Sequence, residues 1–449
     1  MPPHPNPMQI PDRLPVRART RNRRFLESDY ENDYENEYDI DYEHDYEHEH
    51  DLGGFGMLQG ATRRELLKGT ALAAAGLALG GQLKAEVTDG KPGAVPVVDI
   101  TDLYHPSQDP GDNFDLIAAY GLPEVDLKAV VFDVTERYRR PYKNPDNPMY
   151  DDPAGRRDAG FVPVTQLNYI FDRNVPCAAA PFDAMKSPGD RMLEAPTFQS
   201  AGVELLLRAL RESPVPVEVV SFGSARPAAV AFNREPDLMR EKVKRIHLCA
   251  GSAPPGFLEW NVQLDVHGFV RLLRSDLPLA VYPCGGEKSA WDLAVNNCYW
   301  QLPDRSLIRR LHPRLQSYLA FAFERSMRMD FLCAMDEKVP EEVLQRICGG
   351  PHAVWETAVW TQVAGRKLVR RGNGTHRLVP AAEVTPADTP ILEGVRPCRI
   401  EAGDDGQFRF EYTEGESNAA IYFREDPVAY QVALREALPA LYESFTCRR

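Results

Sequence analysis

The chain has 449 residues, of which 43% are hydrophobic and 26% charged, and this excludes both a small disulfide-stapled scaffold and a wholly disordered protein. The formal net charge is −14, but residues 1–56 alone carry fourteen acids against six arginines, so −8 lies there and −6 in the rest. The rest of the chain therefore lacks the basic balance that binding to a phosphate backbone needs, and we do not expect nucleic acid as a partner.

Residues 1–56 form an extension with its own composition. A Pro- and Arg-rich start is followed, from Glu27 to Asp51, by a repetitive tract of Asp, Glu and Tyr with almost no aliphatic residues. Such a segment cannot bury enough apolar surface to fold, so we expect it to be disordered. Met57 follows it directly, and a start there would give the next segment the length of an ordinary export signal.

Residues 57–90 are similar to a twin-arginine export signal followed by a linker. Arg63 and Arg64 precede a run of small apolar residues, 69–81, that is too short to cross a bilayer as a stable helix. The pattern predicts an extracytoplasmic protein, periplasmic or secreted, without a stable membrane anchor. The alternative is an Ala-rich surface helix, in which case the protein would remain cytoplasmic.

The domain expected over residues 94–446 is of the α/β class, with an open, mostly parallel sheet flanked by helices. Short apolar runs alternate with segments of helical periodicity, which is typical of β-α units. We expect a functional loop at Arg139–Arg157, mostly helical structure over 289–350, late strands over 397–423 and a closing helix over 427–445. The earlier strands are expected at 95–100, 127–134, 215–224, 243–251 and 277–285, and the earlier helices at 112–122, 201–213, 225–233 and 266–275.

An acidic cluster follows the first expected strand, where ligands of such sheets bind. Five carboxylates lie within seventeen residues, and they repel one another unless a cation neutralises them. Hard oxygen ligands favour Ca²⁺, with Mg²⁺ as the less favoured ion. The alternative for Asp112 is a role as helix N-cap only. The five are Asp99, Asp102, Asp109, Asp112 and Asp115.

The eight cysteines are widely spaced, without a C-x-x-C pair or a histidine at zinc-site spacing. We therefore expect them to be buried or free thiols.

Residues 97–131, VVDITDLYHPSQDPGDNFDLIAAYGLPEVDLKAVV, resemble the opening of the inosine-uridine-preferring nucleoside hydrolases, whose first strand ends in an aspartate-rich metal-binding loop. Counted back from Pro123, Asp112 matches the second aspartate of that family's adjacent pair, and Gly111 stands in place of the first. The resemblance thus implies a Ca²⁺ ligated by Asp112, with Asp102, Asp109 and Asp115 as further ligands.

The resemblance continues in the same order along residues 94–446. The segment VEVVSFGS matches a strand and turn in which the Phe222 carbonyl would bind the metal, and HAVWETAVW offers Glu356 as the last metal ligand. The triplet Glu259-Trp260-Asn261 matches the residues that contact the ribose hydroxyls. Taken singly, Glu259 would be a surface charge and Asn261 a turn residue, while Trp355 would be an ordinary core residue and Glu356 an exposed helix position.

The implied activity is metal-dependent hydrolysis of the N-glycosidic bond of ribonucleosides. Asp102 or Asp99 would be the general base, His352 a proton donor, and Trp355 a stacking partner for the base. Gly111, Glu136 and Glu356 depart from the family pattern, so a non-catalytic nucleoside- or sugar-binding protein, or a hydrolase of another glycosidic substrate, is the alternative. The sequence leaves the base preference open and is compatible with a homo-oligomer.

Overall fold

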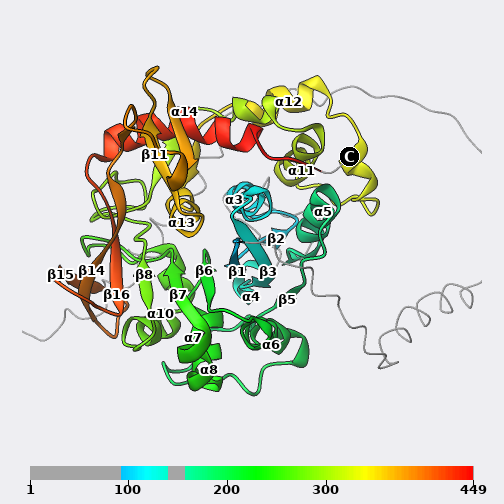
Figure 1. The fold of residues 1–449 in the computed structure, drawn as a ribbon. Helices are drawn as coiled ribbons and strands as arrows, with labels where there is room; N and C mark the ends of the chain where they lie inside the picture. The colour runs from blue at the N-terminus through cyan, green and yellow to red at the C-terminus, as the bar shows by residue number, and fades with distance from the viewer. Residues whose placement is uncertain (1–92, 140–156, 448–449) are drawn as a thin grey trace, which may run out of the picture. The chain divides into compact units, whose positions relative to one another are not determined.

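In the computed structural model, a nine-stranded sheet has the order β15-β14-β16-β8-β7-β6-β1-β3-β5 (Figure 1). Neighbouring strands pair in parallel from β16 to β5, whereas β14 pairs antiparallel with both β16 and β15. The expected α/β class with an open, mostly parallel sheet is therefore confirmed. The strands are β1 (Val95–Thr101), β3 (Val125–Phe132), β5 (Cys177–Ala179), β6 (Val217–Ser221), β7 (Val243–Leu248), β8 (Leu279–Val281), β14 (Glu393–Ala402), β15 (Phe408–Tyr412) and β16 (Ala419–Arg424).

The structure describes residues 93–139 and 157–447, which all belong to one unit spanning residues 87–449. The acidic extension, the export signal and most of the loop expected at Arg139–Arg157 lie outside the described residues. In the described part of the chain, no helix has both the length and the apolar character needed to cross a membrane.

Helices cover both faces of the sheet, because each strand sends alternate side chains to opposite faces. In β1, Val97 packs into one buried cluster, whereas Val98 and Ile100 pack into the other. The first cluster is covered by α3 (Pro110–Gly121), α5 (Phe161–Phe171), α11 (Pro313–Phe323), α13 (Thr357–Val363) and α14 (Pro427–Glu443). The second is covered by α6 (Thr197–Glu212), α7 (Arg226–Arg234), α8 (Pro236–Lys242) and α10 (Val266–Leu273).

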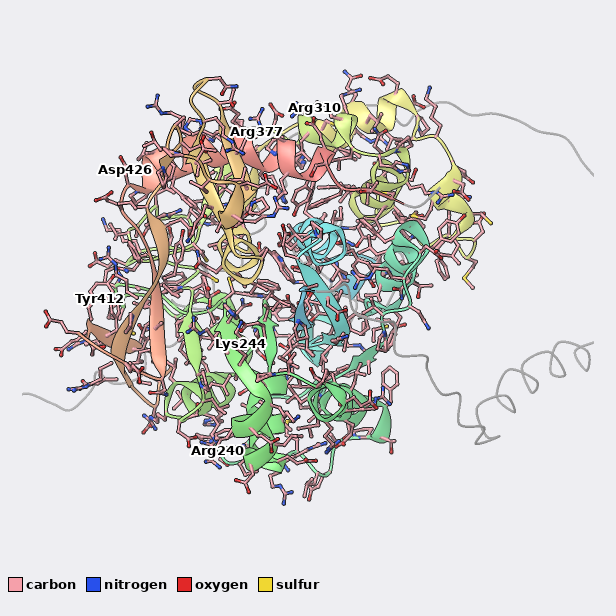
Figure 2. The ribbon with its side chains drawn as sticks, in the orientation of Figure 1. Arg240, Lys244, Arg310, Arg377, Tyr412 and Asp426 are labelled. Carbon is pink, nitrogen blue, oxygen red and sulfur yellow. The ribbon has the colours of Figure 1, made fainter. Side chains whose placement is uncertain are left out.

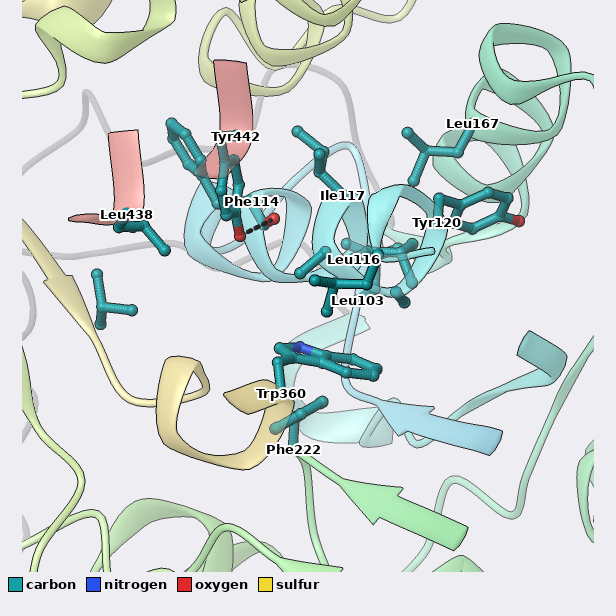
Figure 3. Close-up of a cluster of buried hydrophobic side chains, with 14 of the residues drawn as sticks. Leu103, Phe114, Leu116, Ile117, Tyr120, Leu167, Phe222, Trp360, Leu438 and Tyr442 are labelled. Atoms are coloured by element: carbon teal, nitrogen blue, oxygen red, sulfur yellow. Dashed lines mark hydrogen bonds between the residues drawn. The ribbon is translucent and has the colours of Figure 1, made fainter. Parts of the chain in front are cut away.

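Helix α3, which carries part of the acidic cluster, is held by a large apolar contact (Figure 3). Its Phe114 and Ile117 are buried, and Trp360 of α13 belongs to the same cluster. The Tyr442 hydroxyl of α14 donates a hydrogen bond to the Phe114 carbonyl over 3.0 Å. The helix is therefore fixed by residues from the end of the domain.

Two regions differ from the sequence expectation. Residues 289–350 become helical only from Ser306, through η2 (Ser306–Arg310), α11, η3 (Cys333–Asp336) and α12 (Glu341–Cys348), after a strand, β9 (Trp300–Leu302). The short strands β10 (His352–Val354), β11 (Arg366–Arg370), β12 (His376–Pro380) and β13 (Thr389–Pro390) were not expected, because they contain few consecutive apolar residues. The remaining short elements are β2 (Tyr104–His105), α4 (Glu136–Arg139), β4 (Asp158–Ala159), α9 (Trp260–Leu264) and η4 (Ala381–Glu383).

Basic side chains on the outside of the fold are paired with acids rather than gathered together (Figure 2). Of those labelled in the figure, Arg240 pairs with Asp276 at 2.8 Å and Arg310 with Glu443 at 2.9 Å. Lys244 likewise lies 2.9 Å from a glutamate, Glu218. These charges are therefore compensated locally.

Candidate active site

The strand order reverses at β1, because the chain adds β3 and β5 on one side of it and then β6, β7 and β8 on the other. At such a point the loops that follow adjacent parallel strands diverge and leave a crevice. The loop after β1 carries Asp102, and the loop after β6 carries Phe222 and Gly223. The two loops touch, since a Cβ built on Gly223 would lie 3.2 Å from the Asp102 Cβ.

Six carboxylates gather around this point, and we call them the acid cluster: Asp99, Asp102, Asp109, Asp112, Asp115 and Glu356. Burial and the charge of Glu356 raise the pKa of Asp99 to about 8. Burial and neighbouring acids hold the pKa values of Asp102, Asp112 and Asp115 well above the usual range. Asp99 and Asp115 are buried, whereas the other four are half-buried, so the cluster keeps an accessible side.

The acids at the start of α3 have different local roles. Asp109 is the N-cap and accepts a hydrogen bond from the Gly111 N–H over 2.7 Å. Asp112 lies in the first turn and Asp115 one turn later, where its carboxyl is hydrogen-bonded to Glu356. Asp109 rather than Asp112 therefore caps the helix, so capping does not explain Asp112.

A buried ion pair lies next to the acid cluster. Asp133, directly after β3, lies 2.6 Å from the guanidinium of Arg226, and both side chains are fully buried. Burial raises the pKa of Asp133 to about 6 although Arg226 acts against it, and Asp133 in turn raises the pKa of Asp102. Gly223 lies against this pair, because a Cβ there would come within 2.9 Å of the Asp133 carboxylate.

The Phe222 carbonyl is held by the predicted ribose-binding segment. Asn261 Nδ2 donates to the Phe222 carbonyl over 3.0 Å and to the Cys249 carbonyl over 2.8 Å. Glu259 caps α9 and accepts from the backbone N–H of Asn261 and of Gly251, and burial raises its pKa to about 7. A carbonyl has two lone pairs, so Phe222 keeps one for a further partner.

The two predicted tryptophans lie in different surroundings. Trp355 is half-buried beside the acid cluster, where its backbone N–H donates to Glu356 over 2.9 Å. Its ring packs against Trp291 and Tyr299, with centroid distances of 5.3 Å and 5.4 Å. Trp260 instead packs against Tyr138 of α4, at 4.8 Å.

His352, the predicted proton donor, lies in surroundings that oppose its protonated form. The ring is buried in β10 and packs 4.9 Å from the Phe114 ring. Burial, together with the charge of Arg305, lowers its pKa to about 3. His352 is therefore uncharged at neutral pH and has no proton to give as an imidazolium.

The chemistry of the acid cluster fits a hard divalent cation. Its donors are carboxylate oxygens, and Asp99 Oδ1 is buried without a hydrogen-bond partner among the described residues. In the described part of the chain, however, no three of these carboxylates have oxygens that all lie within 4.8 Å of one another. Among the described residues, the one group of three His, Cys, Asp or Glu side chains with all ligand atoms within 4.8 Å of one another is Cys249, Cys284 and Cys298.

Asp133, Arg226 and the cysteine group were not among the predicted site residues. Asp133 could have been predicted as a site residue, because it is an acid directly after a strand, as Asp102 is. The cysteine group could not have been predicted, since the three cysteines do not have the sequence spacing of a metal site.

In sequence, the chain is similar to two curated proteins named pyrimidine-specific ribonucleoside hydrolase RihA. The protein from Citrobacter koseri is 26% identical over 191 residues, which are 38% of this chain and 57% of that protein. The protein from Enterobacter sp. (strain 638) is 33% identical over 96 residues, which are 20% of this chain and 30% of that protein. The matches thus span 57% of the length of the first of these curated relatives and 30% of the second. No protein-family model matches.

Among solved structures, the chain is similar to an inosine-guanosine nucleoside hydrolase, with a TM-score of 0.46 and 13% identity over 78% of this chain and 99% of that one. It is also similar to a purine-preferring ribonucleoside hydrolase from Gardnerella vaginalis, with a TM-score of 0.41 and 11% identity over 78% of this chain and 99% of that one.

Proposed function

We propose that this chain is a metal-dependent hydrolase that cleaves the N-glycosidic bond of ribonucleosides to free base and ribose. The observation that carries the proposal is the gathering of six carboxylates and the Phe222 carbonyl where the strand order reverses. The sequence relatives, which are named as ribonucleoside hydrolases, support the same class of substrate.

In this proposal the acid cluster and the Phe222 carbonyl hold one Ca²⁺, with Asp102, Asp109, Asp112, Asp115 and Glu356 as the carboxylate donors. When bound, the ion supplies Lewis acidity to the attacking water and a point of attachment for the ribose diol.

The residues of the chain supply the remaining functions. Asp102 is the better placed of the two candidate general bases, because Asp99 is only 1% exposed whereas Asp102 is half-buried in the loop beside Gly223. Asn261 directs Nδ2 to two carbonyls, which leaves Oδ1 to accept a hydrogen bond from a ribose hydroxyl. Trp355 offers the face on which the base stacks.

The test of this function is release of reducing sugar from a panel of purine and pyrimidine ribosides with Ca²⁺ present. We expect slow cleavage of at least one riboside and little cleavage of the 2′-deoxynucleosides, which cannot offer a diol to the ion. If no riboside is cleaved while ribose or a nucleoside still raises the melting temperature, the chain is a binding protein instead. Cleavage of only non-nucleoside glycosides would favour the other hydrolase alternative.

We also propose that the protein is exported in the folded state by the twin-arginine route. The paired Arg63 and Arg64 support this, and both lie outside the described residues. Replacing both by Lys should retain the protein in the cytoplasm, as measured by cell fractionation and immunoblotting against wild type. Equal extracytoplasmic yields of the two proteins would refute export by this route.

A further inference from the structure

Three cysteines from distant parts of the sequence meet in the core below the candidate active site. Cys249 Sγ lies 3.4 Å from Cys284 Sγ and 3.7 Å from Cys298 Sγ. Their residues are 1%, 5% and 0% exposed, in the same order. We call these residues the cysteine triad.

The main chain, rather than the thiols, brings the triad together. Cys249 directly follows β7 and Cys284 comes shortly after β8, and these two strands are parallel neighbours. The Cys298 N–H donates to the Pro283 carbonyl over 2.9 Å, which fixes the third residue beside the second. The three thiols are therefore set in place by the sheet and one loop.

The spacing of the triad fits a tetrahedral thiolate site. A Zn–S distance of about 2.3 Å places two sulfur ligands of one tetrahedral ion about 3.8 Å apart. The Sγ–Sγ distances from Cys249 to Cys284 and to Cys298 are close to this value. The Tyr282 carbonyl lies 3.8 Å from the sulfurs of both Cys284 and Cys298, so it is close to the position that a fourth ligand would take.

The charge around the triad also fits a divalent ion. Arg424 is fully buried, and its Nη1 has no hydrogen-bond partner in the described part of the chain. Its Nη2 donates to Oδ1 of Asn297, the residue directly before Cys298, over 2.7 Å, which places the guanidinium charge close to the triad. Three thiolates, one divalent ion and one guanidinium sum to zero charge, which a buried site requires.

We propose that Cys249, Cys284 and Cys298 bind one soft divalent cation of the zinc class through three thiolates. This site is distinct from the acid cluster, whose oxygen donors prefer a hard ion. The backbone carbonyls of the triad hold two proposed substrate contacts: Cys249 accepts from Asn261, and Cys284 accepts from the Trp355 indole over 2.9 Å. The bound ion would therefore also steady these two side chains.

The test uses the full chain, purified under reducing conditions and titrated with Zn²⁺ and Co²⁺ in the presence of excess Ca²⁺. We expect one Zn²⁺ per chain that Ca²⁺ does not displace, and with Co²⁺ a thiolate-to-metal charge-transfer band. Cys298→Ala should weaken Zn²⁺ binding by roughly 100-fold or more. Cys333→Ser is the matched control, because Cys333 is an exposed thiol outside the triad, and it should bind as wild type does.

A second measurement on the wild type avoids the risk that a core variant misfolds. Bound Zn²⁺ should protect the three triad thiols from alkylation in partly denatured protein, as mass spectrometry of the labelled peptides would show. A wild-type chain that binds neither ion would overturn the proposal, as would Cys298→Ala binding Zn²⁺ as tightly as Cys333→Ser. None of these results depends on whether ribosides are cleaved.

Discussion

Asp112→Ala is expected to abolish riboside hydrolysis, with a loss on the order of 10³-fold or more in kcat/KM, equivalent to about 4 kcal/mol of transition-state stabilisation. The substitution removes one of the carboxylates proposed to hold the ion. Asn261→Ala should reduce turnover less, because it removes a hold on the ribose hydroxyls rather than a donor to the ion. The measurement is steady-state kinetics on the best riboside, with Ca²⁺ varied for each variant.

The stability of Asp112→Ala makes this test specific. Burial and neighbouring acids raise the pKa of Asp112, so in the absence of Ca²⁺ its removal should leave the melting temperature unchanged or higher. Asp237→Ala is the matched control, because Asp237 also lies in the first turn of a helix that begins with Pro, but its side chain is 98% exposed. If Asp112→Ala retains turnover, or loses it only through unfolding, Asp112 is not a ligand.

The second large effect expected is a fall in the stability of the calcium-free protein as the pH rises. Asp99 has an ordinary pKa of 3.8 but keeps its proton in the folded chain up to about pH 8. Between these values the folded state binds a proton that the unfolded state has lost, so its contribution is fully present below the lower value and is lost toward the upper. Between about pH 6.5 and 8, deprotonation of Asp99 should lower the free energy of unfolding by roughly 2 kcal/mol.

This window separates the acid cluster from other titrating groups. The buried His247 and His352 have lowered pKa values, so from about pH 7.5 they are neutral in both the folded and the unfolded chain. Below that pH their titration raises stability with rising pH, opposite to the effect of Asp99. Thermal unfolding in chelator should therefore show a melting temperature that falls across the window, and added Ca²⁺ should raise it most at the upper end. Asp99→Asn should flatten the curve. A melting temperature that rises with pH in chelator would contradict the proposed cation site.

Much of the fold could be predicted because its strands are buried on both faces. Continuous apolar runs such as residues 95–98 and 129–132 mark the parallel sheet, and helical periodicity marks α6, α10 and α14. The small sheet of β11, β12 and β13 could not be predicted in this way. Its strands are short and mostly half-buried, so their sequence carries no periodic signal.

Residues of the candidate site could be predicted where they stand directly after a strand. Asp102 was found because it follows a strand and Phe222 through the family resemblance, and the structure brings their loops into contact. The neutral state of His352 was not predictable, since it arises from burial against Phe114 of a distant helix. The same limit applies to the cysteine triad, which exists only because β7 and β8 are adjacent.

The pairing of β16 with β8 has a consequence for how the protein is synthesised. Leu279, Ala280 and Val281 of β8 are all buried, and their partners in β16 are Ala419, Ala420 and Ile421. A nascent chain therefore exposes β8 as an unpaired edge until residue 424 has left the ribosome, and such an edge is prone to pair with other chains. The central sheet is therefore completed only when nearly the whole chain has been made, and until then β8 is one of its free edges.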